Sequence, residues 1–145
     1  MKVLQLTNKN IQAVAANSFM PLGISTIKYP NDRVECQPTF TVASSASDTL
    51  VINRGGTYRL DYQASVMAGA IGTVTLAVVV NGVTIYTTSA SAAAASDLVN
   101  ITIPLDIYVP CNCNSLPNSV PANVQIQSTG VALTGGISNL IITKY

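Results

Sequence analysis

A chain of 145 residues is the length of one ordinary domain, and its net charge of +1 comes with no basic stripe that could follow a phosphate backbone, so nucleic-acid binding is disfavoured. Charged residues make up only 9% of the chain, against about 25% in typical soluble domains. Because Ser, Thr, Asn and Gln take the place of charges, the surface is typical of a protein covered by neighbouring subunits rather than of a free cytosolic enzyme.

The first ten residues, MKVLQLTNKN, turn polar by the seventh position. They therefore lack the roughly 7–15 apolar residues of a secretory signal, and no segment reaches the roughly 18 apolar residues of a membrane span. We expect synthesis in the cytoplasm and no membrane association. Pro21, Gly23 and Pro30 break the first thirty residues into short pieces. We expect residues 1–30 to form an N-terminal arm or attachment segment, followed by one domain over 31–145.

Strand patterns begin near residue 40. The short apolar runs 40–42 and 50–52 flank a Ser-rich turn. In 56–66, apolar or aromatic side chains occupy the even positions from Tyr58 to Val66, and polar ones occupy the odd positions. This alternation predicts a half-buried strand with one face in water.

A hairpin is predicted next. Runs rich in β-branched residues at 73–80 and 83–88 are separated by Asn81-Gly82. Asn-Gly favours a two-residue type I′ turn, because both central residues of that turn need a positive φ. The Ser/Ala run at 89–96 is too short for an independent helix, so we expect a loop with at most one helical turn.

Three more segments complete the pattern. Residues 99–109 keep one apolar face across Pro104, which predicts an edge position, a bulge or a bend there because proline has no amide hydrogen. A strand starts at Val124 and Ile126 after a Pro-containing loop at 112–121, and 137–145 alternates again. Eight to ten short strands at this spacing predict an all-β antiparallel sandwich or barrel.

Catalytic chemistry finds little support. The chain has no histidine, which excludes Ser-His-Asp and Cys-His machinery within it. A pair of carboxylates from distant strands would leave no trace in the sequence, and that alternative stays open. The simplest interpretation of Asp61 beside Arg59 is a surface pair. We expect no catalytic residues, no cofactor and no enzymatic activity. The six carboxylates are Asp32, Glu35, Asp48, Asp61, Asp97 and Asp106.

The three cysteines, Cys36, Cys111 and Cys113, allow more than one interpretation. Cytoplasmic synthesis predicts reduced thiols that behave as small apolar side chains. A zinc site would need a fourth ligand, usually histidine, so we expect no metal. A disulfide from Cys36 to Cys111 or Cys113 after release into an oxidising medium stays open.

From Gly55 to Thr88, the order Gly-Gly-Thr-Tyr-Arg-Leu-Asp-Tyr, a Gly/Ala-rich turn and Val-Thr-Leu-Ala-Val-Val-Val-Asn-Gly-Val resembles the middle of C1q/TNF-like jelly-roll domains. The segment 137–142 resembles their final strand. With 14–23 at the start, the layout also resembles head-fibre or capsid decoration proteins of tailed bacteriophages. Unlike collagen-tailed relatives, the chain has no Gly-X-Y segment, so any tether would have to come from residues 1–30.

The resemblance implies a single jelly-roll β-sandwich that forms a homotrimer around a threefold axis on a virion surface. It places Tyr58, Tyr62 and Ile142 near the interface between copies. The implied partners are other copies of the chain and the major capsid protein or another virion protein. The alternative is a glycan- or receptor-binding tip of a phage tail or adhesion device, for which Tyr58, Tyr62 and Tyr86 could offer a stacking platform for a sugar of the host surface.

Overall fold

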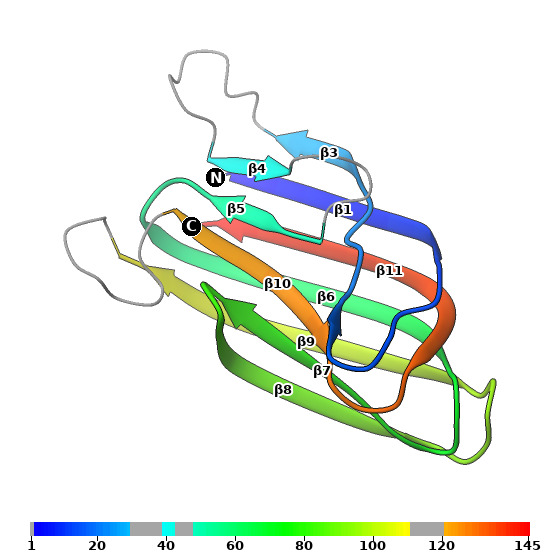
Figure 1. Ribbon diagram of the computed structural model, residues 1–145. Helices are drawn as coiled ribbons and strands as arrows, with labels where there is room; N and C mark the ends of the chain where they lie inside the picture. The colour runs from blue at the N-terminus through cyan, green and yellow to red at the C-terminus, as the bar shows by residue number, and fades with distance from the viewer. Residues whose placement is uncertain (1, 30–38, 43–47, 111–120) are drawn as a thin grey trace.

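A computed structural model describes residues 2–29, 39–42, 48–110 and 121–145, and it shows two antiparallel sheets packed face to face (Figure 1). Eleven strands and no helix are found in these ranges. It follows that the described residues contain no helix suited to crossing a membrane. The predicted all-β antiparallel jelly-roll sandwich is confirmed.

The first sheet, called sheet A, has five strands in the order β3-β1-β11-β6-β9. Its strands pair along most of their lengths, and the β6–β9 ladder runs without a register shift from Gly56 opposite Val109 to Met67 opposite Leu98. The strands are β1 (Lys2–Ile11), β3 (Ile24–Tyr29), β6 (Gly56–Ala68), β9 (Leu98–Val109) and β11 (Leu133–Lys144).

The second sheet, called sheet B, has the order β4-β5-β10-β7-β8, with the short β2 also paired to β10. None of its strands contains a charged residue. The strands are β2 (Ser18–Phe19), β4 (Phe40–Val42), β5 (Leu50–Ile52), β7 (Gly72–Val80), β8 (Val83–Ala92) and β10 (Ala122–Ser128).

The core lies between the two sheets and follows the alternation of the strands. Along β6, every second side chain from Tyr58 to Ala68 is buried and points towards sheet B, while those between them face outward. Phe40 contacts Tyr58 edge to face, with ring centroids 5.7 Å apart. The aromatic positions thus fill the space between the layers, as the even-numbered pattern predicted.

The expectation of a separate N-terminal arm over residues 1–30 is wrong for the described residues. β1 lies inside sheet A, paired with β11 on one side and β3 on the other, and β2 pairs with β10 in sheet B. Leu4 and Leu6 of β1 belong to the core. Because these side chains are buried and the strand has a partner on both sides, β1 is a central strand of the sheet and not a separate arm. The boundary at residue 30 therefore separates no independent unit.

The predicted hairpin is confirmed. Val80 pairs with Val83, and the two residues of the turn have positive φ angles, 49° at Asn81 and 81° at Gly82. Pro104 lies in the edge strand β9, so of the three possibilities the edge position is correct. The Ser/Ala run was only partly a loop, because β8 continues to Ala92 before the turn begins.

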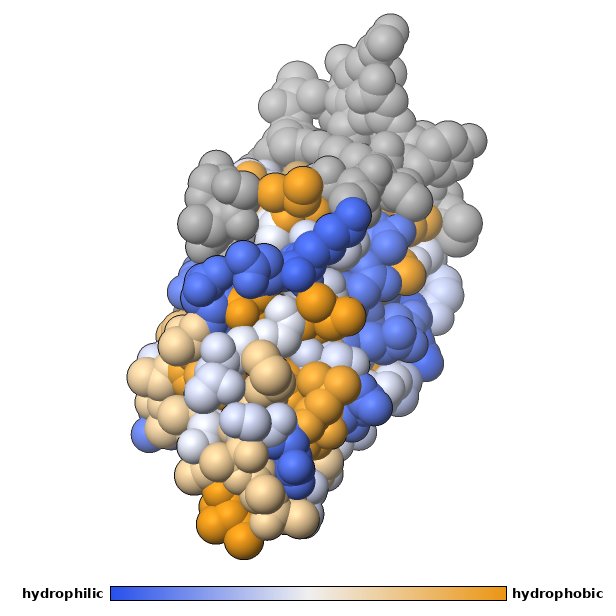
Figure 2. All heavy atoms as spheres, turned by 90° about the vertical axis from the view of Figure 1, so that its right-hand side faces the viewer, coloured by the Kyte–Doolittle hydropathy of each residue, from blue (hydrophilic) through white to orange (hydrophobic). Residues whose placement is uncertain are grey.

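The two ends of the described chain lie at the same end of the sandwich (Figure 1), where Lys2 pairs with Lys144. Figure 2 looks onto the opposite end, which carries the turns at 69–71 and 93–97. Hydrophobic and weakly polar side chains gather over its lower part, below a band of hydrophilic ones. Ile71 and Leu98 are 71% and 63% exposed.

Candidate functional site

The carboxylates of the described residues have structural partners rather than a shared reaction centre. Asp97 accepts hydrogen bonds from the main-chain nitrogens of Ala93 and Ala94, at 3.1 and 3.0 Å, and so closes the turn after β8. Asp48 accepts one from the Thr49 hydroxyl at 2.9 Å. Within the described part of the chain, no three Cys, Asp or Glu side chains come together as a metal site. The three cysteines, Asp32 and Glu35 lie outside the described residues.

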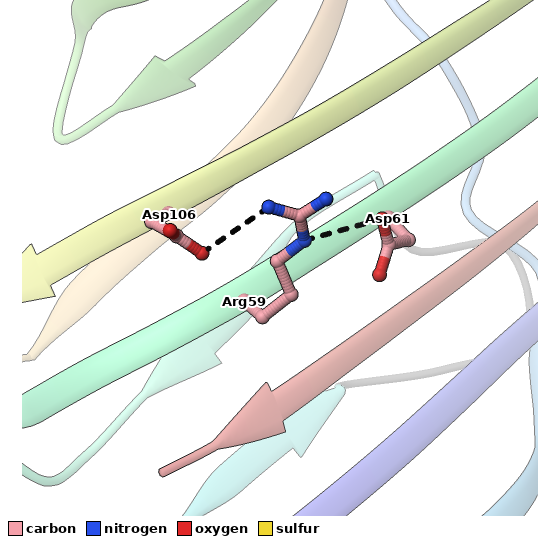
Figure 3. A network of polar contacts seen from close by, with 3 residues as sticks. All are labelled: Arg59, Asp61 and Asp106. Atoms are coloured by element: carbon pink, nitrogen blue, oxygen red, sulfur yellow. Dashed lines mark hydrogen bonds and ion pairs between the residues drawn. The ribbon is translucent and has the colours of Figure 1, made fainter.

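Asp61 and Asp106 share one cation on the outer face of sheet A (Figure 3). Arg59 of β6 lies between them, with its Nε 3.4 Å from Asp61 and an Nη 3.5 Å from Asp106 of β9. Desolvation pulls the pKa of Arg59 down, but the two carboxylates outweigh it and raise the pKa above its usual value. The predicted surface pair is therefore a trio, held by cross-strand neighbours.

The residues expected at an interface between copies, Tyr58, Tyr62 and Ile142, lie inside the single chain. All three are fully buried between the sheets. Burial raises the pKa of the Tyr58 hydroxyl to about 12, and that hydroxyl donates to the main-chain oxygen of Arg54. These side chains form the core, so a contact between copies would have to use other residues, which face outward. Tyr86, the third member of the suggested sugar platform, is half-buried against the core from β8 in sheet B, so the three rings form no shared surface.

The outer face of sheet A carries most of the exposed apolar side chains. Five of the eight large hydrophobic residues that are exposed in the described chain lie on it, whereas sheet B has one, Val83 at the turn end of β8. Ile137 is 54% exposed in the middle of β11, and Leu98 and Tyr108, 63% and 65% exposed, lie near the two ends of β9. The five residues are Ile24, Met67, Leu98, Tyr108 and Ile137.

Two adjacent depressions of about 540 and 480 Å³ hollow this face, and both are lined by Ser65 and Ile137. The larger one crosses β1, β11, β6 and β9. The smaller one lies between Met67 and Leu98 on one side and Asn10 and Gln12 on the other. Gly135 and Gly136 add no side chain to its floor. The face is therefore a shallow trough with an apolar ridge at Ile137.

Polar side chains cover most of the rest of the trough, with Lys9 as the charged residue of the larger depression, and several of the neutral ones are hydrogen-bonded to one another. The carboxamide oxygen of Asn139 accepts hydrogen bonds from Gln5 at 2.8 Å and from the Thr7 hydroxyl at 3.1 Å. Ser65 donates to the Asn100 side chain across the β6–β9 ladder. These bonds join four strands of sheet A and hold the carboxamides in place. The arrangement can bind a ligand or another protein by surface contact.

The alternation of buried and exposed positions did not identify the apolar residues on the outer face of sheet A. An apolar residue at a position of outward parity, such as Ile137 between the buried Gly135 and Leu140, or Leu98 before the buried Val99, is the signal that could have found them. In the sequence, Leu98 only forms an apolar pair with Val99, and Ile137 follows two glycines, so neither residue stands out as a break in the alternation.

Comparison with known proteins shows the fold. No protein-family model and no curated protein sequence matches the chain. The globular domain of zebrafish complement 1qA superposes with a TM-score of 0.68 at 7% identity, covering 99% of this chain and 97% of that one. Murine APRIL gives 0.66 at 11% identity, with 99% and 98% covered, and the PRD1 vertex protein P5 gives 0.61 at 18%, with 99% and 96% covered.

These similarities define the class of fold. The chain has the jelly-roll fold of these C1q and TNF-family domains, as the resemblance in its sequence implied. Identities of 7–18% show a shared architecture. Function has to be argued from the faces that the architecture presents.

Proposed function

We propose that the chain is a non-enzymatic structural protein of a tailed-bacteriophage virion, a capsid decoration or head-fibre subunit that assembles as a homotrimer on the particle surface. The observation that carries the proposal is the concentration of five exposed large apolar side chains on the outer face of sheet A. The structural similarity to the PRD1 vertex protein supports a place on a virion. Synthesis in the host cytoplasm, followed by attachment to the major capsid protein or another virion protein, completes the proposal.

The outer face of sheet A is large enough for a stable contact. Five strands at a spacing of about 4.8 Å, with the 12 residues of β9 rising about 3.4 Å each, span about 20 by 40 Å. This is about 800 Å², the area that each partner buries in a standard protein interface. Among the charges on this face, Arg59, Asp61 and Asp106 neutralise each other in part, whereas Lys9 lines the larger depression.

A closed ring of three copies needs head-to-tail contacts, in which one surface of a copy meets a different surface of the next. The edge of sheet A at β9 is a suitable second surface, and Leu98 and Tyr108 lie where this edge adjoins the outer face. Pro104 has no amide hydrogen, and it interrupts the free edge of β9. Copies are therefore expected to pack through side chains instead of forming a continuous sheet.

The assembly is tested by light scattering during size-exclusion chromatography. We expect a trimer for the natural chain and a monomer for Ile137→Glu, since a carboxylate at the ridge would be desolvated on association. Thr87→Glu is the matched control, because Thr87 is exposed on the outer face of sheet B, and this variant should stay trimeric. A natural chain that elutes as a stable monomer contradicts the proposed assembly.

The virion role is tested separately on purified particles. Mass spectrometry should detect the chain in particles, and imaging at a resolution that shows individual subunits should place it on the capsid surface. Particles that lack the chain would count against the role whatever its oligomeric state.

A second candidate function is binding of an uncharged glycan, favoured by the carboxamide groups that line the larger depression. Gln63, Asn100 and Asn139 could exchange hydrogen bonds with sugar hydroxyls. A glycan array with the purified protein discriminates between the two functions. Glycan binding that is lost in Asn100→Leu and kept in Thr87→Glu would favour the second function. A trimer that forms through the same trough would cover the carboxamide groups and prevent such binding.

A further inference from the structure

The turn between β7 and β8 is fastened to β10 by an asparagine. The main-chain nitrogen of Asn81 donates to the oxygen of Asn123 at 2.9 Å, and the nitrogen of Asn123 donates to the Asn81 side-chain oxygen, Oδ1, at 2.8 Å. The pair continues the β7–β10 ladder one step past Val80, which pairs with Val124. In Figure 1 the turn is the tip of the β7–β8 hairpin. Its second residue, Gly82, is exposed, and a Cβ atom there would meet nothing within 4 Å.

We propose that Asn81-Gly82 is a site of spontaneous deamidation, and that its contacts with Asn123 hold the reaction back in the folded chain. Asn81 is the one asparagine of the sequence followed by glycine. The deprotonated main-chain nitrogen of Gly82 attacks Cγ of Asn81, a C–N bond forms, and the side-chain nitrogen leaves as ammonia. Water then opens the five-membered succinimide to aspartate or isoaspartate. Glycine favours the attack because it has no side chain beside the nucleophile.

The folded turn opposes this reaction in two ways. Ring closure requires the Gly82 nitrogen to approach Cγ, whereas the bond from Asn123 fixes Oδ1, and with it Cγ, in the direction of β10. The bond from the Asn81 nitrogen holds the main chain in its left-handed conformation, with φ at 49°. Both bonds must open before the side chain can rotate. Two hydrogen bonds of ordinary net strength correspond to a rate about 30-fold lower in the folded chain.

Isoaspartate, one of the two products, cannot restore the turn. Isoaspartate adds a methylene group to the main chain of a two-residue loop whose geometry depends on two positive φ angles. Either product adds a negative charge beside sheet B, whose strands contain no charged residue. A hairpin that carries isoaspartate should therefore lose part of its attachment to β10, and chains with either product should separate from the unmodified ones by charge.

The experiment is peptide mapping by mass spectrometry after incubation at mildly alkaline pH, with the chain folded or unfolded in urea. We expect Asn81 to convert faster than any other asparagine in the unfolded chain and about 30-fold more slowly in the folded chain. Asn100 and Asn139, which precede Ile and Leu, are the internal controls. Gly82→Ala is compared only in urea, where its effect on folding is irrelevant, and should slow the conversion of Asn81.

Three results would overturn the inference. Equal rates in the folded and unfolded chain would show that the contact with Asn123 protects nothing. Faster conversion at another asparagine in urea would place the site elsewhere. An unchanged rate in Gly82→Ala would exclude the proposed attack. None of these results depends on whether the chain forms trimers.

Discussion

Pro104 of β9 faces Asp61 of β6 in the ladder of sheet A, and the pairing continues on both sides of them without a register shift. An uninterrupted ladder at a proline means that its nitrogen points to the free edge, where no partner strand needs a hydrogen bond from it. Pro104 thus opposes the addition of a further strand at the longest edge of sheet A and does not weaken the sheet itself.

Replacing this proline should expose the edge. We expect Pro104→Thr to change the free energy of unfolding by less than about 1 kcal/mol, since no ladder bond changes. The new amide hydrogen should increase association through strand addition. Static light scattering against concentration measures this, and Thr102→Pro, at a neighbouring outward-facing position of the same strand, is the reverse comparison. Unchanged association in Pro104→Thr would contradict the guarding role.

The inclusion of β1 in sheet A predicts a large effect of a core truncation near the N-terminus. Leu6 is fully buried, and Leu6→Ala should cost about 2–5 kcal/mol in the free energy of unfolding. Lys9 is exposed on the same strand, so Lys9→Ala should stay within about 0.5 kcal/mol of the natural chain. Urea denaturation measures both. Equal small effects would mean that β1 is dispensable.

Gly23 leads into β3 in a conformation that only glycine adopts easily. Its φ is +91°, and a Cβ atom would lie 2.2 Å from the main-chain oxygen of Thr7. Gly82 has a similar φ, +81°, with nothing within 4 Å. We therefore expect Gly82→Ala to cost about 1–2 kcal/mol and Gly23→Ala clearly more, with the difference due to the clash. Thermal unfolding of the two variants checks this order.

The two buried tyrosines should respond differently to loss of their hydroxyl groups. Tyr58 donates a hydrogen bond to Arg54, so Tyr58→Phe should cost about 1 kcal/mol. The Tyr62 hydroxyl has no well-formed hydrogen bond, although Ser138 lies near enough to lower its pKa slightly. Tyr62→Phe should therefore be neutral or stabilising by chemical denaturation. A larger loss in Tyr62→Phe than in Tyr58→Phe would contradict the assignment.

The same residues predict how the fold responds to alkali. Desolvation raises the pKa of Tyr62 from 10.0 to about 12. Because the folded chain holds the proton more tightly than the unfolded chain, the associated stability is complete below pH 10 and is lost as the pH rises towards 12. We expect the protein to unfold over the same pH range in which tyrosinate forms. Ultraviolet absorbance measures the formation of tyrosinate. The alkaline loss should be smaller in Tyr62→Phe.

The middle of the fold could be predicted from sequence because its strands alternate regularly and Asn81-Gly82 defines a turn. There is a physical reason why the N-terminal strand, β1, could not be predicted from the sequence. In β1 the core residues Leu4 and Leu6 are followed by a polar stretch, and the β1–β11 register shifts between Asn8 and Ile11, which breaks the period of two. The end of β8 was not predicted because the side chains that face inward there, Ala90 and Ala92, are small and do not stand out in a Ser/Ala run.

The exposed apolar face of sheet A was harder to predict than the fold. Alternation identifies which side chains face the core, and it correctly separates Tyr58 from Arg59. It cannot tell which apolar residues of the outward set, such as Ile137, gather on one surface, because that depends on the order of the strands in the sheet. The resemblance pointed to Tyr58, Tyr62 and Ile142, which belong to strands of sheet A and face the core of the single chain.

The division of charge between the two layers has an experimental consequence. Sheet A strands contain five basic and two acidic residues, whereas sheet B strands contain none of either. An anionic support should therefore capture the molecule in one preferred orientation, with the uncharged layer facing the solution. Added salt should weaken the attraction to the support and release the molecule, and it should leave the uncharged sheet B unaffected.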